Sequence, residues 1–458
     1  MHRDDTICAI ATAPGEGGVG IVRISGPASL SILCALYRGA RGGRRTDWPS
    51  HRLLLGHVVD PDSGEAIDQV LAVYMPAPRS YTGEDVAELH GHGGAASLRR
   101  IVDVALRLGA RVPDPGEFTQ RAFLNGRIDL AQAEAVIDVI RARTDVSLRA
   151  AMGQFGGKLS ARVRALTDQL LDWIAQLEAT LDFPEDDIPS VSTDRLLRGA
   201  DEVLEGLEAL LARAEQGRVL RDGVRVAIVG TPNVGKSSLL NALLGEQRAI
   251  VTEVAGTTRD SIEEWLDIDG VPMRIVDTAG IRESTDRIEV EGIDRARRHL
   301  ESADLVLFVI DGSRALGDDD RSIADLSAQR PRIVVVNKSD LDLAADVQAV
   351  AEPCEVVRIS ARSGHNLTLL RAAMVTKVAG GVVTISDETV GGNLRHRDAL
   401  YRAREHVRKA RETAAAGLAA DFVTIDLKAA VDALGEITGA NITEEVITRI
   451  FSQFCLGK

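Results

Sequence analysis

The chain has 458 residues, of which 45% are hydrophobic and 27% are charged, and its net charge is −14. This balance is typical of a globular protein with roughly two to four domains, and it excludes a disordered, collagen-like or rod-shaped chain. The negative charge and the aromatic content of 3% disfavour a broad RNA-binding surface, so any RNA contact needs a local basic surface or a partner.

The sequence also disfavours membrane attachment and export. No apolar run approaches the roughly 18–20 residues of a membrane span. The first residues carry no secretory pattern, so we expect a cytoplasmic protein with no membrane partner. The cysteines lie far apart and form no C-x-x-C pair, which disfavours a disulfide framework or a four-cysteine zinc site; they are Cys8, Cys34, Cys354 and Cys455.

Four consecutive regions differ in their periodicity. Residues 1–119 mix short β-like runs with Gly/Pro loops, which predicts an α/β domain. Residues 120–217 and 380–458 are helical. Residues 218–379 alternate helices with buried-strand candidates, which indicates a parallel sheet covered on both faces; the candidates are 224–229, 274–276, 305–310, 333–336 and 356–359. Since helical segments flank this block, we predict that it is inserted into a helical bundle.

A phosphate-binding pattern opens the α/β block. Residues 230–237 read G-T-P-N-V-G-K-S, which fits G-x-x-x-x-G-K-[ST]. The pattern follows a strand candidate and begins a helix, so backbone N–H groups and the helix N-terminus face the phosphates. We expect Lys236 on the β- and γ-phosphates and the Ser237 hydroxyl on Mg²⁺. The alternative is an ordinary Gly-rich turn between a strand and a helix.

A second motif follows the strand candidate 274–276. Residues 277–280 read D-T-A-G, which places Asp277 near Mg²⁺ and the Gly280 N–H near the γ-phosphate. Thr257 and Thr258 lie between the two motifs, and one of these hydroxyls can complete the Mg²⁺ shell.

Two further motifs identify the base. Residues 337–340 read N-K-S-D, and Asp340 can accept two N–H donors that guanine has and adenine lacks. Residues 360–362 read S-A-R, follow another strand and are expected to pack against the base. Alone, N-K-x-D is as often a surface loop. The ordered set of motifs predicts a guanine nucleotide site.

The hydrolytic machinery departs from that of Ras. The position after D-T-A-G, where a Ras-type enzyme has Gln, is Ile281, which cannot orient water. Catalysis therefore needs a substitute polar group and added positive charge. Asn233 and the Gly/Thr-rich residues 252–260 can bind a monovalent cation beside the phosphates. The alternative is that Asn233 only caps its loop.

Residues 222–378 resemble the translation-factor-related GTPases. Essentially the whole chain resembles the bacterial tRNA wobble-uridine modification GTPase family, called MnmE or TrmE. Beyond the nucleotide motifs, the resemblance rests on residues 23–26 (RISG), 80–94 (SYTGEDVAELHGHGG), 115–127 (PGEFTQRAFLNGR) and 454–458 (FCLGK).

The resemblance implies a multidomain α/β plus α fold. Its parts are an N-terminal α/β domain that binds 5-formyl- or methylene-tetrahydrofolate and dimerises, a helical bundle, and an inserted Ras-like P-loop GTPase domain. The implied folate contacts are Arg23, Glu88, Arg127 and Lys458. Family members can carry Lys at position 127, and Arg keeps the charge while changing its geometry.

The resemblance also implies the residues of the GTP site. These are Asn233, Val234, Gly235, Lys236, Ser237, Ser238, Thr252, Glu253, Val254, Ala255, Gly256, Thr257, Thr258, Asp277, Thr278, Ala279, Gly280, Asn337, Lys338, Ser339, Asp340, Ser360, Ala361 and Arg362. K⁺ would bind Asn233, Thr252, Val254 and Thr257 in the role of an arginine finger. Mg²⁺ would bind Ser237 and Thr258.

Two catalytic residues are implied in the same way. The family's catalytic carboxylate corresponds to Glu289, although spacing alone does not select it over Glu283 or Glu291. Cys455 corresponds to a reactive thiol beside the folate site. An isolated thiol is more often a small core hydrophobe, and this is the alternative for Cys455.

The implied function is tRNA modification by a homodimer. Together with a separate FAD protein, such enzymes install an aminomethyl or carboxymethylaminomethyl group on C5 of the tRNA wobble uridine, with the carbon unit taken from the folate. GTP hydrolysis would act as a switch. Seven basic residues within 391–413 suggest a tRNA surface or a solvated helix face, and the sequence does not separate the two.

Two other classes compete with this hypothesis. A GTPase for ribosome assembly or RNA binding, without chemistry of its own, would carry a basic RNA-binding module, and we find none. A membrane-remodelling GTPase would carry a long amphipathic or apolar insertion segment, and none is evident.

Overall fold

The computed structural model describes residues 5–182, 192–246, 264–276, 300, 302–351, 353–379 and 393–458. The chain forms two compact units. The first comprises Met1–Ile137, Ser160–Asp168 and Val431–Lys458, and the second comprises Asp138–Leu159 and Gln169–Ala430. Within the described ranges, no helix has the length and apolar composition needed to cross a bilayer.

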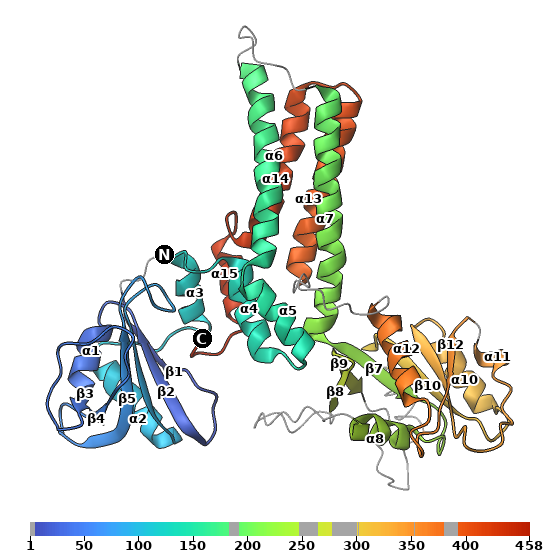
Figure 1. Cartoon of the computed structure of the whole chain (residues 1–458), viewed down its shortest axis with the longest axis horizontal. Coiled ribbons are helices and arrows are strands. Elements are labelled where there is room, and N and C mark those ends of the chain that lie inside the picture. The colour runs from blue at the N-terminus through green and yellow to red at the C-terminus, as the bar shows by residue number, and fades with distance from the viewer. Residues whose placement is uncertain are drawn as a thin grey trace. The chain divides into compact units, whose positions relative to one another are not determined.

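The first unit is built on a six-stranded antiparallel sheet with the order β1-β2-β6-β5-β4-β3 (Figure 1). Its strands are β1 (Ile7–Ile10), β2 (Gly17–Ser25), β3 (Tyr37–Gly39), β4 (Leu54–Val59), β5 (Ala66–Met75) and β6 (Val86–Gly93). The helices α1 (Ser29–Leu36) and α2 (Ala95–Arg107) share a core with Val22, Ile24 and Leu89 of the sheet. Because side chains alternate along a strand, the residues between these core positions point to the opposite face.

Ion pairs connect the N-terminal segment of the first unit to helix α3 (Glu117–Leu124). The guanidinium of the buried Arg121 contacts Asp5 at 2.6 Å and Glu117 at 2.9 Å. It also contacts Glu84 at 3.1 Å. Burial would raise the pKa of Glu117, but hydrogen bonds from Arg111 and Arg121 hold that pKa below its ordinary value of 4.5. The network therefore stabilises charged carboxylates inside the unit.

The end of the chain also packs in the first unit. The remaining helices are α3 (Glu117–Leu124), α4 (Leu130–Arg141) and α15 (Glu444–Phe451), and apolar side chains of α4 and α15 share a core. The N–H of Gly116 donates to the Cys455 carbonyl at 3.3 Å. Gly457 lies so close to β1 that an added Cβ would overlap the carbonyl of Ile10. The last four residues are thus held beside the sheet.

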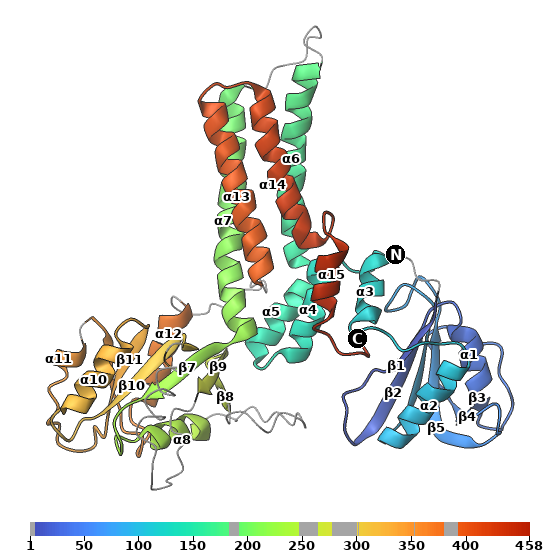
Figure 2. The ribbon, with the colours of Figure 1, turned by 180° about the vertical axis from the view of Figure 1, so that it is seen from behind.

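Long helices form the bundle of the second unit. They are α5 (Asp145–Phe155), α7 (Thr193–Asp222), α13 (Leu394–Ala415) and the larger parts of α6 (Lys158–Asp182) and α14 (Ala420–Thr438), of which residues 160–168 and 431–438 belong to the first unit. The helices α7 and α13 lie side by side in both views (Figures 1 and 2), and ion pairs join Arg411 to Asp201 at 2.6 Å and Arg397 to Glu215 at 2.9 Å. The chain segments before and after the α/β block therefore pack together, as expected for an insertion.

The α/β block contains a six-stranded sheet with the order β12-β11-β10-β7-β9-β8. Its strands are β7 (Val224–Val229), β8 (Glu264–Ile268), β9 (Val271–Val276), β10 (Leu305–Asp311), β11 (Arg332–Asn337) and β12 (Glu355–Arg358). All neighbours are parallel except β8, which pairs antiparallel with β9. The helices of the block are α8 (Lys236–Glu246), α10 (Asp318–Ser327), α11 (Gln348–Ala351) and α12 (Leu367–Ala379), and two apolar cores contain alternate residues of β10. The predicted Ras-like fold is confirmed, while strand β8 was missed.

The turn between β8 and β9 contacts the start of α5. The Thr144 hydroxyl donates to the carbonyl of Gly270 at 2.8 Å, and the Arg143 guanidinium lies 4.1 Å from the ring centre of Trp265. Gly270 has a φ of +90°, and an added Cβ would overlap Val146. Only glycine accommodates this close approach at a positive φ.

Candidate functional site

The phosphate loop begins where β7 ends, and α8 begins at Lys236. The Lys236 ammonium donates to the carbonyls of Gly230 and Thr231, both at 2.9 Å, so the loop backbone orients the charge. Gly235 has a φ of +98°, and an added Cβ would overlap the Asn337 amide. Ser237 and Ser238 are exposed on the first turn of α8. This cradle of backbone around a lysine suits a phosphate group.

Asn337 joins the phosphate loop to the loops expected around the base. Its Nδ2 donates to the carbonyl of Val234 at 2.8 Å, and its Oδ1 accepts from the Ala361 N–H at 3.0 Å. The residue is 3% exposed, so both bonds are protected from water. One side chain therefore fixes three of the predicted segments relative to one another.

The two charged residues of the N-K-S-D motif face different partners. Lys338 forms an ion pair with Asp311, at 2.6 Å, at the end of β10. Burial would raise the pKa of Asp311, but the bonds from Lys338 and Ser313 lower it. Asp340 is fully exposed, and a hydrogen bond with Ser360 lowers its pKa. The Asp340 carboxylate is thus ionised and accessible to a ligand.

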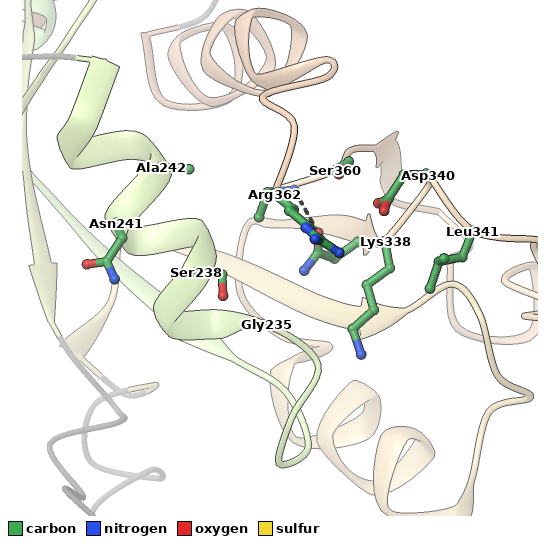
Figure 3. A pocket seen from close by; sticks show the side chains of 11 residues that line it. Gly235, Ser238, Asn241, Ala242, Lys338, Asp340, Leu341, Ser360 and Arg362 are labelled. Atoms are coloured by element: carbon green, nitrogen blue, oxygen red, sulfur yellow. Dashed lines mark hydrogen bonds between the residues drawn. The ribbon is translucent and has the colours of Figure 1, made fainter.

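A cavity of about 620 Å³ lies between α8 and these loops (Figure 3). The volume is in the range typical of small-molecule sites. It is lined by Gly235, Ser238, Asn241, Ala242, Asn337, Lys338, Asp340, Leu341, Ser360, Ala361 and Arg362. The structure therefore brings together residues from the phosphate loop, the N-K-S-D motif and the S-A-R motif.

The remaining predicted nucleotide residues lie outside the described ranges. They are Thr252, Glu253, Val254, Ala255, Gly256, Thr257, Thr258, Asp277, Thr278, Ala279, Gly280 and Glu289. Of the predicted metal ligands, the structure thus describes Ser237 and Asn233. Asn233 is exposed in the phosphate loop with a φ of +63°, a conformation that is uncommon for a residue other than glycine.

Three of the four predicted folate residues form one cluster in the first unit. Arg23 on β2 pairs with Glu88 on β6 at 2.8 Å, and His90 contacts the other oxygen of Glu88 at 2.9 Å. Burial and the charge of Arg23 lower the pKa of Lys458, while Cys455 and Glu88 oppose this effect. The exposed Arg127 instead donates to the Ser80 carbonyl at 3.1 Å.

The four cysteines differ in access. Burial raises the pKa of the Cys8 thiol to about 12, which makes it inert at neutral pH. Cys455 is exposed, next to the cluster of Arg23 and Lys458. Exposure disfavours the alternative that Cys455 fills a core. The structure contains all four cysteines as free thiols.

The basic segment on α13 is largely neutralised. Besides the two pairs with α7, Arg402 contacts Asp398 at 2.8 Å, and Arg404 and Arg408 share Glu405 at 2.9 and 2.5 Å. Exposed pairs of this kind still leave positive charge within reach of a phosphate, but they weaken the local potential. The solvated-face interpretation is therefore favoured over a tRNA surface here.

Two acidic residues beside the nucleotide loops belong to no motif that the sequence shows. Asp311 pairs with Lys338, and the buried Asp320 bonds to Thr231 in the phosphate loop. Asp311 could have been suspected, because it ends a buried strand at the edge where the other motifs lie. Asp320 stands in an acidic helix start, D-D-D, which no local pattern distinguishes from an ordinary first turn.

A phosphate loop after the first strand of a mostly parallel sheet, with an N-K-S-D loop across one cavity, defines a Ras-like P-loop GTPase. Family models extend the assignment: residues 130–455 match the MnmE helical domain, and residues 6–127 match the GTP-binding protein TrmE N-terminus. The chain is 48% identical to tRNA modification GTPase MnmE of Heliobacterium modesticaldum, over 99% of both chains.

A second relative and a solved structure are also similar to this chain. The same protein of Chloroflexus aurantiacus is 48% identical over 99% of this chain and 100% of the relative. Among solved structures, Era of Aquifex aeolicus is 30% identical, with a TM-score of 0.27, over 40% of this chain and 66% of that chain. The chain belongs to the tRNA modification GTPase MnmE family and is a GTP-hydrolysing enzyme.

Proposed function

We propose that this enzyme is a K⁺-stimulated GTPase that acts with an FAD-containing partner protein. Together they add an aminomethyl or carboxymethylaminomethyl group to C5 of the wobble uridine of certain tRNAs, using a tetrahydrofolate carbon unit. In this proposal residues 1–119 bind folate and dimerise, 120–217 and 380–458 form the helical domain, and 218–379 are the GTPase domain. The family membership supports the reaction, and the cluster at Glu88 carries the assignment of the folate site.

That cluster brings two half-buried cations close together. Arg23 pairs with Glu88, and burial and the charge of Arg23 lower the pKa of Lys458, an effect that Cys455 and Glu88 offset only in part. A folate brings carboxylates and a polar pterin edge, which would stabilise both cations and satisfy Glu88. The exposed Cys455 thiol lies beside the same cluster. Donor chemistry and charge thus fit an anionic, hydrogen-bonding ligand.

Titration with 5-formyl-tetrahydrofolate tests this assignment. We expect Arg23→Ala and Lys458→Ala each to weaken binding by about tenfold or more, as for loss of a charge-assisted bond. Arg107→Ala is the matched control, because Arg107 also pairs with a carboxylate in the first unit, at Asp60, away from the cluster. Equal binding by all three variants would refute the site.

The face of the first sheet opposite α1 and α2 supports the proposed homodimer. Leu55, Leu71 and His90 stand side by side on neighbouring strands of this face, and the two leucines are 53% and 42% exposed. Exposed apolar rows of this kind mark protein interfaces. Leu71→Glu should shift the sedimentation of the protein from dimer to monomer, whereas Leu369→Glu, at a 60% exposed leucine of α12, should not.

Each proposed cation site combines a residue of the phosphate-binding motif with residues from 252–258. Mg²⁺ would bind the Ser237 and Thr258 hydroxyls. K⁺ would bind Asn233, Thr252, Val254 and Thr257 and supply positive charge beside the phosphates. Asn233 is exposed in the phosphate loop, so its side chain is accessible to a cation. GTP turnover should be faster in K⁺ than in Na⁺, and Asn233→Ala should remove the difference. Equal wild-type rates in the two salts would reject the K⁺ site.

Glu289 is proposed as the catalytic carboxylate. Glu289→Ala should cut GTP turnover while leaving nucleotide binding nearly intact, and normal turnover would exclude the role. For the reaction as a whole, mass spectrometry of tRNA nucleosides from cells lacking this gene should show loss of the wobble-uridine modification. An intact modification would favour a GTPase for RNA binding or ribosome assembly.

A further inference from the structure

The first variable position of the phosphate loop is anchored from outside the loop. Thr231 follows Gly230 and is 6% exposed, so its hydroxyl is shielded from water. The hydroxyl donates to Asp320 Oδ1 at 2.8 Å and accepts from the Arg314 guanidinium at 2.8 Å. Both partners come from the segment that follows β10, with Arg314 lying 83 and Asp320 lying 89 residues further along the chain. The Thr231 side chain thus attaches the phosphate loop to the segment that contains Arg314 and Asp320.

Asp320 is held from several directions. The residue is 1% exposed and lies in the first turn of α10. Its Oδ2 accepts from the Gly317 N–H at 3.0 Å and contacts Arg314 at 3.1 Å, while Oδ1 accepts from Thr231. A carboxylate taken out of water is tolerated only when its partners compensate it. These bonds fix the carboxylate in one orientation, so it is a rigid support for Thr231.

The backbone of Thr231 in turn orients the phosphate-binding lysine. The Lys236 ammonium donates to the carbonyls of Thr231 and of Gly230. An ammonium has three N–H donors, so two bonds to fixed carbonyls set the direction of its charge. Thr231 therefore lies between Asp320, bound to its side chain, and Lys236, bound to its carbonyl.

We infer that Asp320, acting through Thr231 and neutralised by Arg314, is a positioning residue that presets Lys236 for the β-phosphate of the nucleotide. The inference rests on the proposed role of Lys236 in phosphate binding. Preorganisation of this kind favours ligands that reach the lysine and is neutral toward those that do not. It thus raises the affinity for nucleoside diphosphates and triphosphates relative to the affinity for monophosphates.

The test is the ratio of affinities for GDP and GMP, measured on the full-length protein by competition with a fluorescent GDP. Thr231→Val removes the hydroxyl at nearly constant volume and should lower the GDP/GMP ratio by about tenfold. Thr231→Ser keeps the hydroxyl and should stay within about twofold of wild type. Asp320→Asn should lower the ratio as well, whereas Asp319→Asn, at an exposed position in the same turn, should not.

The variants distinguish phosphate binding by Lys236 from the positioning role of Asp320 and Thr231. Lys236→Ala is the reference, and an unchanged GDP/GMP ratio in that variant would remove the proposed role of the lysine itself. A reduced ratio in Lys236→Ala together with an unchanged ratio in Thr231→Val would overturn the inference alone. Equal weakening of GDP and GMP by Thr231→Val would indicate a structural role and would also overturn it. If Asp320→Asn fails to fold, the Val and Ser variants of Thr231 still decide the question.

Discussion

Replacing Asn337 with Ala should loosen the nucleotide site more than any exposed substitution in the same cavity. The amide bridges the carbonyl of Val234 and the N–H of Ala361 through bonds of 2.8 and 3.0 Å, and it is almost fully buried. Alanine satisfies neither group. The phosphate loop and the S-A-R loop would then lose the side chain that holds them in register.

The expected loss of stability follows from the two backbone groups, the Val234 carbonyl and the Ala361 N–H, that alanine leaves without a partner. A buried donor or acceptor left without a partner costs about 1–3 kcal/mol, so two of them cost about 2–6 kcal/mol. Water entering the vacated space offsets part of this, which leaves about 2–4 kcal/mol. If the loops relax in the free protein, binding must restore their arrangement. The loss of GDP affinity is then about 30-fold to 700-fold, at about 1.4 kcal/mol per factor of ten.

Equilibrium titration with a fluorescent GDP measures this loss directly. Asn241→Ala is the matched control, because Asn241 lines the same cavity but is exposed on α8. We expect the control to stay within about threefold of wild type, since exposed substitutions are usually close to neutral. Asn337→Ala with an affinity as close to wild type as that of the control would refute the bridging role.

Three further outcomes follow from the described residues. Because the pKa of Glu117 is lower in the folded protein, its charge stabilises the fold above about pH 4.5, and this contribution is lost as the pH falls below that value. Glu117→Gln should therefore flatten the acid side of the unfolding free energy measured against pH, and parallel curves would contradict the reasoning. Gly270→Ala should destabilise the second unit by about 2–4 kcal/mol, because of the positive φ and the overlap with Val146. Gly245→Ala in α8 is the control, since its added Cβ meets no neighbouring atom. Equal unfolding midpoints of the two variants in differential scanning calorimetry would show that this packing is unimportant. Iodoacetamide at about pH 8 should leave Cys8 unmodified until the protein is denatured, and rapid labelling of the native protein would show that the thiol is not buried.

The GTPase fold was predictable because its signals are local. A buried strand in a parallel sheet is a short run of apolar residues, and β7, β10 and β11 lie within a residue of the predicted limits. Motifs that directly follow parallel strands meet at one edge of the sheet, so the cavity beside Asn337 and Asp340 also follows from spacing. The edge strand β8 escaped prediction, because Glu264–Ile268 is short and its sequence, E-W-L-D-I, shows neither a continuous apolar run nor a strict polar/apolar alternation.

The sequence by itself determined the class of nucleotide, the order of the domains and the family. The nucleotide motifs are short contiguous stretches whose spacing is visible in the sequence, and each domain has its own hydrophobic periodicity. Only the tertiary structure decided that Arg121 pairs with Asp5 and Glu84, and that Asp320 supports Thr231. These pairs are separated by long stretches of chain, and no periodicity links their positions. They meet because the sheets and helices between them pack in one arrangement, which depends on every buried contact together and on no single segment.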